Sequence, residues 1–140
     1  MSIDDNKAMA RRANALWATG EAENFDDIFT DGYQNHQEPY VAGGTSAVSL
    51  SEYKKLLAGY HAAFSNSRNE ILSQVAEGDL VATRWRFTAV QTGEYQGLAA
   101  TNKEASWTGV QIDRLENGKI AESWVDWDKY GLFAQLGLVN

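Results

Sequence analysis

The sequence predicts a single α+β domain, with helices packed on one face of a strongly curved mixed or antiparallel sheet. Segments with helical periodicity occupy the first half of the 140-residue chain, and segments of alternating polarity follow one another from residue 70 onward. An Asn117–Gly118 pair between two alternating segments is the strongest short-range signal for a β-hairpin. A chain of this length buries about two thirds of its unfolded surface, so we expect one domain over 1–140.

The composition indicates a packed globule and excludes several classes of function. Hydrophobic residues make up 44% of the chain, and five Trp, six Tyr and five Phe are enough for a cavity lined by aromatic rings. The absence of cysteine excludes a disulfide framework and thiolate metal sites, and two histidines are too few for a histidine-rich zinc site. We therefore predict no thiolate or histidine-rich metal site.

Charge and hydropathy limit the expected partners and location. The net charge is −7 and the twelve Lys and Arg residues are scattered, which argues against nucleic acid as a partner. No segment approaches eighteen consecutive apolar residues, and the N-terminus lacks the basic and apolar regions of a signal peptide. We expect a soluble, unprocessed, cytoplasmic protein that does not contact membranes.

Residues 4–19 are expected to form the first helix, since apolar side chains recur there every three to four positions: Met9, Ala13, Leu16 and Trp17. Gly20 is the expected stop, and a short second helix is predicted over 21–29. A turn at 31–32 then leads into a short strand through Tyr33 and His36, and residues 41–49 are expected to be a flexible connection.

Ser49 and Glu52 fit a capping box that opens the next helix. This helix carries a stripe of apolar side chains at helical spacing: Leu50, Tyr53, Leu57, Tyr60 and Phe64. His61 lies beside the stripe and is expected to pack there. Residues 65–69 are predicted to be a turn, followed by a strand over 70–77 and a reversal at Gly78–Asp79.

The strand that follows alternates clearly. One face carries Val81, Thr83, Trp85, Phe87 and Ala89, and the other carries Ala82, Arg84, Arg86 and Thr88. Residues 91–103 contain two glycines and no apolar period, so we expect a long loop that closes over a cavity. Leu132, Phe133 and Leu136 predict a short C-terminal helix before Gly137.

The Asn117–Gly118 turn sets an expected register for the hairpin. In a regular ladder Asp113 lies opposite Glu122, and Gln111 lies opposite Trp124. One face then combines acids with indoles: Trp107, Gln111, Asp113, Glu122, Trp124, Asp126 and Asp128. A carboxylate beside a tryptophan has a raised pKa because burial disfavours its charged form. This face is therefore the best candidate for acid/base chemistry.

An alternative reading makes the same face a solvated outer surface. Two carboxylates directly opposite each other are unfavourable unless a cation or a β-bulge intervenes. Arg84 and Arg86 on the neighbouring strand could then neutralise Asp113 and Glu122.

Four strings occur in this order along the chain: AEGDLVATRWRF at 76–87, TGEYQG at 92–97, RLENGKIAESW at 114–124 and WVDWDKYGLFAQLG at 124–137. Together they resemble the SnoaL-like polyketide cyclases, also called ester cyclases, of the nuclear transport factor 2-like superfamily. The resemblance implies a cone-shaped α+β barrel with a pocket between the helices and the concave sheet. It also implies ring closure on aromatic polyketide esters by an intramolecular aldol condensation, without metal or cofactor.

The resemblance further implies site residues. An aspartate near the end of the Trp-x-x-x-Asp string is the expected acid/base, which here is Asp128, with Asp126 as its competitor. His36 matches a residue that faces the pocket in the family. Gln91 stands where many relatives have histidine, and it can donate a hydrogen bond but cannot exchange a proton. We expect the substrate to contact Trp17, Tyr33, Tyr60, Trp85, Gln91, Trp107 and Trp124.

The leading hypothesis is an enzyme that removes a proton next to a carbonyl of a small hydrophobic molecule and stabilises the enolate while a ring closes. Relatives are often dimers, so we expect a homodimer formed through the outer face of the sheet. One alternative is water activation as in epoxide hydrolases, by Arg84 or Arg86 with Asp113 and Asp126. The other is a non-catalytic pocket that only binds a small apolar molecule.

Overall fold

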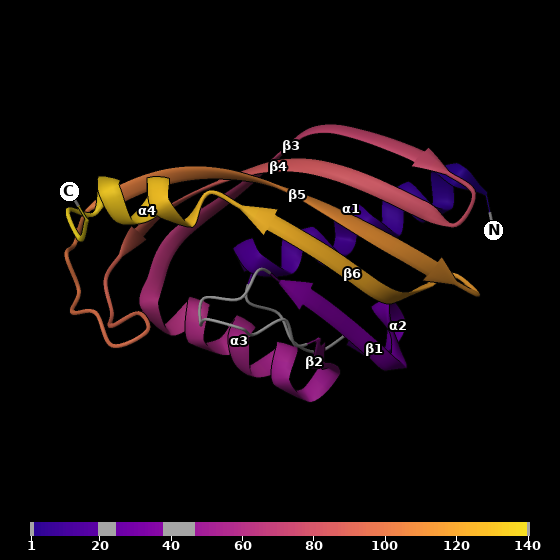
Figure 1. Ribbon diagram of the computed structural model, residues 1–140, viewed down its shortest axis with the longest axis horizontal. Helices are drawn as coiled ribbons and strands as arrows, with labels where there is room; N and C mark the ends of the chain where they lie inside the picture. The colour runs from indigo at the N-terminus through magenta and orange to yellow at the C-terminus, as the bar shows by residue number, and fades with distance from the viewer. Residues whose placement is uncertain (1, 20–24, 38–46, 140) are drawn as a thin grey trace.

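A computed structural model describes residues 2–19, 25–37 and 47–139, and it confirms the α+β class (Figure 1). The described strands form one six-stranded mixed sheet in the order β2-β1-β6-β5-β4-β3. The elements are α1 (Ile3–Thr19), α2 (Phe25–Ile28), β1 (Phe29–Gln37), β2 (Val48–Ser49), α3 (Leu50–Ala63), β3 (Phe64–Glu77), β4 (Leu80–Gln91), β5 (Glu104–Glu116), β6 (Lys119–Trp127) and α4 (Lys129–Gln135).

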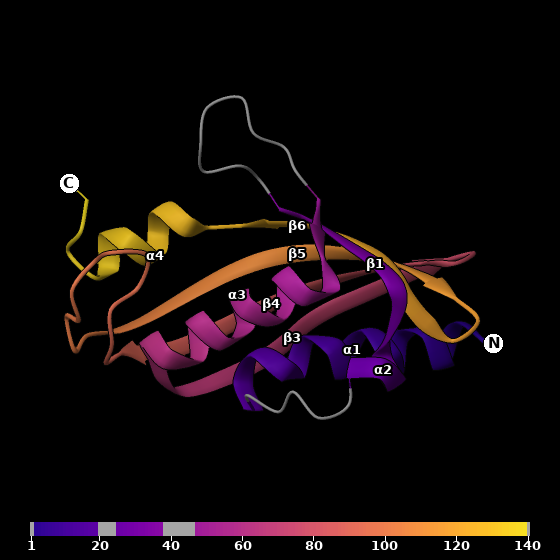
Figure 2. The same ribbon diagram turned by 90° about the horizontal axis from the view of Figure 1, so that it is seen from below.

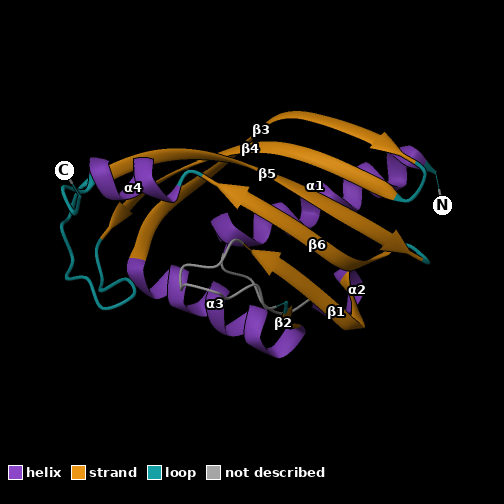
Figure 3. Ribbon diagram, viewed as in Figure 1, coloured by secondary structure: helices purple, strands orange, loops and turns teal. Residues whose placement is uncertain are grey.

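The long strands β3 to β6 form an antiparallel meander, and β1 joins its edge parallel to β6. Figures 2 and 3 show α1 and α3 on the same face of the curved sheet, while α4 lies at the far end of β5 and β6. The space between the two long helices and the inner face of the sheet holds the core and, as described below, a cavity. No helix in the described residues is long and apolar enough to span a membrane.

The predicted capping box begins α3. The Ser49 hydroxyl accepts a hydrogen bond from the Glu52 N–H, and the Glu52 carboxylate accepts one from the Ser49 N–H. Two of the four N–H groups that a helix leaves unpaired at its start are therefore satisfied. Tyr53, Leu57 and Tyr60 are buried, so the predicted apolar stripe faces the sheet.

Two predicted turns are strand in the structure. Residues 31–32 lie within β1, where the ladder with β6 shifts register between Phe29 and Gln34. Residues 65–69 lie within β3, which starts directly after α3 because Phe64 pairs with Gln91 at the end of β4. Both places coincide with a register shift, between Phe29 and Gln34 in β1 and between Ser65 and Arg68 in β3, so the polar local sequence forms an irregularity within a strand. The predictions for Gly20 and for most of 41–49 lie outside the described residues.

The hairpin turn forms as predicted, but the predicted register is wrong beyond the first two pairs. Leu115 pairs with Ile120, whereas the next residue, Arg114, pairs with Glu122, so β6 holds one extra residue at this point. This β-bulge moves the rest of β6 by one residue, which turns each of its side chains to the opposite face. Asp113 therefore pairs with Ser123 instead of Glu122.

The arginines of β4 do not neutralise Asp113 or Glu122. Arg84 and Arg86 alternate with the buried residues of β4, so they lie on the outer face, where Arg86 pairs with Glu70 at 3.2 Å. Glu122 contacts Arg114 and His36 instead. The outer face also exposes Val110, Ile112 and Trp124, and the homodimer expected from such a surface stays a prediction.

Gly109 on the inner face of β5 provides a test of this packing. A Cβ atom there would overlap the Trp85 ring and lie 2.8 Å from Trp127 Cβ, whereas a Cβ at Gly32 would meet nothing within 4 Å. We expect Gly109→Ala to lower the free energy of unfolding by about 1–3 kcal/mol through overpacking. Gly32→Ala is the control and should change it far less. Chemical denaturation of both variants measures the difference, and equal stabilities would contradict this packing.

Candidate functional site

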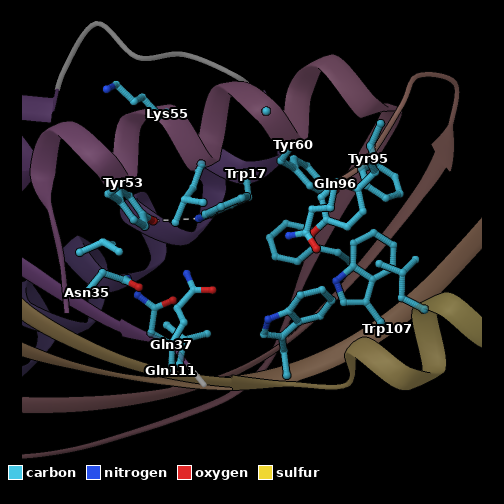
Figure 4. Close-up of a pocket in the computed structure, with 18 of the residues that line it drawn as sticks. Trp17, Asn35, Gln37, Tyr53, Lys55, Tyr60, Tyr95, Gln96, Trp107 and Gln111 are labelled. Carbon is cyan, nitrogen blue, oxygen red and sulfur yellow. Dashed lines mark hydrogen bonds between the residues drawn. The ribbon is translucent and has the colours of Figure 1, made fainter. Parts of the chain in front are cut away.

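A cavity of about 550 Å³ lies between α1, α3, the inner face of the sheet and the loop after β4 (Figure 4). Nine aromatic side chains contribute to its lining: Trp17, Tyr53, Tyr60, Phe64, Trp85, Phe87, Tyr95, Trp107 and Trp127. This volume lies in the range of small-molecule sites, and such sites combine apolar walls with a few polar groups.

The aromatic rings on the helical side hold one another in place. Trp17 makes edge-to-face contacts with Tyr53 and Tyr60, at centroid distances of 5.8 and 5.3 Å. The Trp17 indole N–H also donates a hydrogen bond of 2.8 Å to the Tyr53 hydroxyl. On the opposite wall Trp107 packs on Phe64, with 5.6 Å between their centroids. These contacts form a cavity whose walls exist before any ligand arrives.

Three side-chain amides lie together at one end of the cavity, those of Asn35, Gln37 and Gln111 (Figure 4). The Asn35 amide donates to the Tyr33 hydroxyl at 2.8 Å, while its buried oxygen has no hydrogen-bond partner among the described residues. The Gln111 amide donates to Asp113 Oδ1 at 2.7 Å. This amide end therefore presents neutral donors and acceptors, which suits carbonyl and hydroxyl groups.

Asp113 lies at the next inward-facing position of β5 beyond Gln111, and only 1% of its surface is exposed. Its Oδ1 accepts hydrogen bonds from Gln111 and from the Ser123 hydroxyl, the latter at 2.5 Å. Burial raises the pKa of Asp113 to about 6, and the two hydrogen bonds oppose this shift only in part. A carboxyl group that titrates near neutrality beside a cavity is suited to acid/base chemistry.

The structure places both predicted bases away from the cavity. Asp126 is exposed on the outer face of β6, because the β-bulge inverts the faces of that strand. Asp128 is exposed at the start of α4, where its carboxylate accepts a 2.8 Å hydrogen bond from the Gly131 N–H and caps the helix. Neither residue contributes to the cavity lining, so the placement predicted for them inside the cavity is wrong.

His36 and Trp124 also lie on the outer face. The His36 ring stacks on Trp124 at 5.4 Å, and its Nε2 lies 2.7 Å from Glu122 Oε2. This hydrogen bond is the largest cause of the lowered pKa of Glu122. Since neighbouring residues of a strand face opposite sides, Asn35 and Gln37 line the cavity and His36 does not. The predicted position of His36 in the pocket is therefore wrong.

The other predicted contact residues divide into two groups. Trp17, Tyr60, Trp85 and Trp107 belong to the cavity lining. Tyr33 is buried in the core behind Asn35, and Gln91 is buried among the residues of the following loop, so neither reaches the cavity. The sequence prediction missed Asn35 and Gln37, because their inward direction depends on the irregular pairing of β1. Tyr53 was predicted in the buried stripe of α3 but not as a residue of the cavity.

Charged groups in the described lining are confined to the exposed residues Lys55 and Glu94. No arginine belongs to this part of the lining, so the arrangement of aspartate and arginine expected for water activation on an epoxide does not form there. Within the described residues no group of three or more His, Cys, Asp or Glu side chains could hold a metal ion.

Comparisons with known proteins agree with this architecture. A family model described as SnoaL-like polyketide cyclase matches residues 7–136. The crystal structure of AclR, a putative hydroxylase from Streptomyces galilaeus, is similar with a TM-score of 0.86 and 27% identity, over 99% of this chain and 89% of that chain. IdmH, a putative polyketide cyclase from Streptomyces antibioticus, gives a TM-score of 0.82 and 22% identity, over 94% and 98% of the two chains. A comparison with curated proteins gave no match.

The raised pKa of Asp113 predicts a specific dependence of stability on pH. The folded protein binds the Asp113 proton more tightly than the unfolded chain, whose carboxyl has the ordinary value of 3.8. Stability is therefore lost as pH rises from about 4 to 6, by about 3 kcal/mol in total. Asp113→Asn keeps the acceptor oxygen and should lack this loss. Urea denaturation of both proteins at pH 4 and 7.5 measures it, and parallel profiles would contradict the burial of Asp113.

Proposed function

The chain belongs to the SnoaL-like polyketide cyclase family, and from this premise we propose that it is an enzyme that closes a ring on a neutral aromatic molecule carrying carbonyl groups. The observation that carries the proposal is the combination of an aromatic cavity, an amide end and the buried Asp113 behind it. Fold and family alone do not determine a reaction, so the proposal rests on these groups.

The aromatic walls are suited to binding a flat molecule and folding its flexible arm. Trp17 and Tyr60 approach from the helices and Trp107 approaches from the sheet, and Tyr60 meets Trp107 edge to face with 6.3 Å between their centroids (Figure 4). A planar ring system would pack against this aromatic wall. Holding the two ends of a flexible chain together lowers the entropic part of the barrier to ring closure. A substrate whose flat ring system packs on these aromatic side chains would place its carbonyl end at the amides of Asn35 and Gln111.

We assign the proton transfer to Asp113. Its carboxylate takes a proton from the carbon next to a carbonyl, through one bridging water, because Asp113 lies one inward-facing position beyond the lining residue Gln111. One N–H of each amide bonds Tyr33 or Asp113, and the second N–H of Asn35 and of Gln111 then stabilises the enolate oxygen. The enolate carbon attacks a second carbonyl and forms the new carbon–carbon bond. The resulting alkoxide takes the proton back from Asp113, so the reaction is balanced without an oxidant or reductant.

The near-neutral pKa of Asp113 supports both proton transfers, the removal of a proton from carbon and its return to the alkoxide. A base that titrates near the working pH is deprotonated often enough to remove a proton and acidic enough to return it. Asp126, by contrast, is exposed on the outer face of β6 and does not line the cavity. The rival reading, a cavity that only binds, requires no titrating group at the amide end.

Ring closure on a β-keto ester of an aromatic polyketide, followed by absorbance, tests the assignment. We expect Asp113→Asn to lower kcat by about 100-fold or more, because the proton acceptor is lost while the hydrogen bonds from Ser123 and Gln111 can persist. Asp126→Asn is the matched control on the outer face and should retain the wild-type rate. Equal rates for wild type and Asp113→Asn would refute the role of Asp113, and a wild type that binds the ester without turnover would favour the binding-only reading.

A further inference from the structure

We propose that Gln91 is a specificity-determining residue, which fixes the loop 92–103 in one conformation and thereby limits the length of the molecule that the cavity accepts. This inference rests on the proposed function, because it takes the cavity to be the substrate site. It concerns a residue outside the cavity lining that acts through the loop, and it assigns Gln91 no contact with the substrate.

Gln91 is the last residue of β4 and is completely buried. Its Nε2 lies within hydrogen-bond distance of three backbone carbonyls of the loop: those of Gly93 at 3.2 Å, Leu98 at 3.4 Å and Ala99 at 3.2 Å. Its Oε1 accepts hydrogen bonds from the Thr101 N–H at 3.2 Å and the Thr101 hydroxyl at 2.8 Å. One side chain thus joins the outgoing and returning arms of the loop.

The loop has little other internal structure. Tyr95 and Leu98 exchange one pair of backbone hydrogen bonds, and the ends are tied by bonds between Gln91 and residues 102–103. The N–H groups of Thr92 and Gly93 donate to the Ala63 carbonyl at the start of the loop. Farther along, the Gln91 side chain is the partner of the Ala99 carbonyl and the Thr101 N–H. The conformation of residues 93–101 therefore depends on this buried amide more than on a strand or helix ladder.

The tip of the loop forms one wall of the cavity. Tyr95 and Gln96 belong to the lining, and Figure 4 shows them beside Tyr60 and Trp107, across the cavity from the amide end. The Tyr95 ring contacts Phe64 at 5.1 Å, and the Lys129 ammonium donates a 2.7 Å hydrogen bond to Gln96 Oε1. The position of this wall sets the distance between the amide end and the loop tip. The contacts that hold the loop therefore also limit the length of the molecule that fits in the cavity.

A neutral amide matches this set of partners better than other side chains do. Its NH₂ group faces carbonyl oxygens and its oxygen faces donors, as the five contacts require. A neutral imidazole has one donor and one acceptor, and a carboxylate would place a negative oxygen against three carbonyls. Gln91→Met has a similar size and removes all five contacts. Thr101→Val is milder, because it removes only the hydroxyl, which donates to Gln91 and accepts from the Lys103 N–H.

The experiment measures binding of three neutral hydroxyketones that differ in length, by quenching of tryptophan fluorescence. They are 2-acetyl-1-naphthol, 1-hydroxyanthraquinone and 6-hydroxynaphthacene-5,12-dione, with two, three and four fused rings. A fixed wall should make wild type bind the four-ring probe about tenfold or more weakly than the three-ring probe. Gln91→Met should reduce this ratio by about tenfold and Thr101→Val by less. Gln74→Met is the control, because it removes an amide that bonds Lys7 and Thr83 far from the loop.

Hydrogen exchange of the loop amides gives a second readout that needs no ligand. Gln91→Met should speed exchange at Tyr95, Leu98 and Thr101, and Gln74→Met should not. An unchanged length ratio in both loop variants would overturn the inference even if the proteins are less stable, and so would unchanged exchange in Gln91→Met. If wild type binds none of the probes, the proposed function fails, and the exchange rates still decide whether Gln91 fixes the loop.

Discussion

Asp113 keeps a carboxyl group inside the protein because Ser123 and Gln111 both donate hydrogen bonds to the same oxygen. Burying a carboxyl group without partners would favour a different packing of the core, and burying it with many partners would lower its pKa. For Asp113, burial raises the pKa and the hydrogen bonds from Ser123 and Gln111 lower it, which leaves a pKa of about 6. The chemistry proposed for the cavity depends on this balance.

The elements around Asp113 keep its carboxyl group buried with these two hydrogen-bond donors. The β-bulge in β6 turns Ser123 toward Asp113 and turns Glu122 away, so a second carboxylate does not enter the interior. The aromatic rings of α1 and α3 line the cavity next to this region. At the other end of the cavity Gln91 plays a comparable part, since a buried amide satisfies the backbone of a loop that has no ladder of its own.

The sequence alone could predict the elements better than the site. Periodicity located α1, α3 and the meander, and the Asn-Gly pair located the hairpin, because these signals depend on neighbouring residues. The faces of β6 could not be predicted, since one extra residue at a bulge leaves no local signal and reverses every side chain that follows. Asp126 and Trp124 were therefore assigned to the wrong face. His36 was misplaced for another reason, since it alternates along β1 with Asn35 and Gln37, which line the cavity. Trp17, Tyr60, Trp85 and Trp107 line the cavity, because their strand and helix phases are regular, and their contact with a substrate stays a prediction.

The most direct test is a carbon-13 NMR titration of the aspartate side-chain carboxyl groups, with Asp113 assigned from the resonance missing in Asp113→Asn. A midpoint near pH 6 is expected for Asp113, and addition of 1-hydroxyanthraquinone should shift its resonance while leaving those of Asp126 and Asp128 in place. A midpoint near the ordinary value of 3.8, or a ligand response at Asp126 or Asp128 instead, would contradict a buried acid/base at the amide end of the cavity.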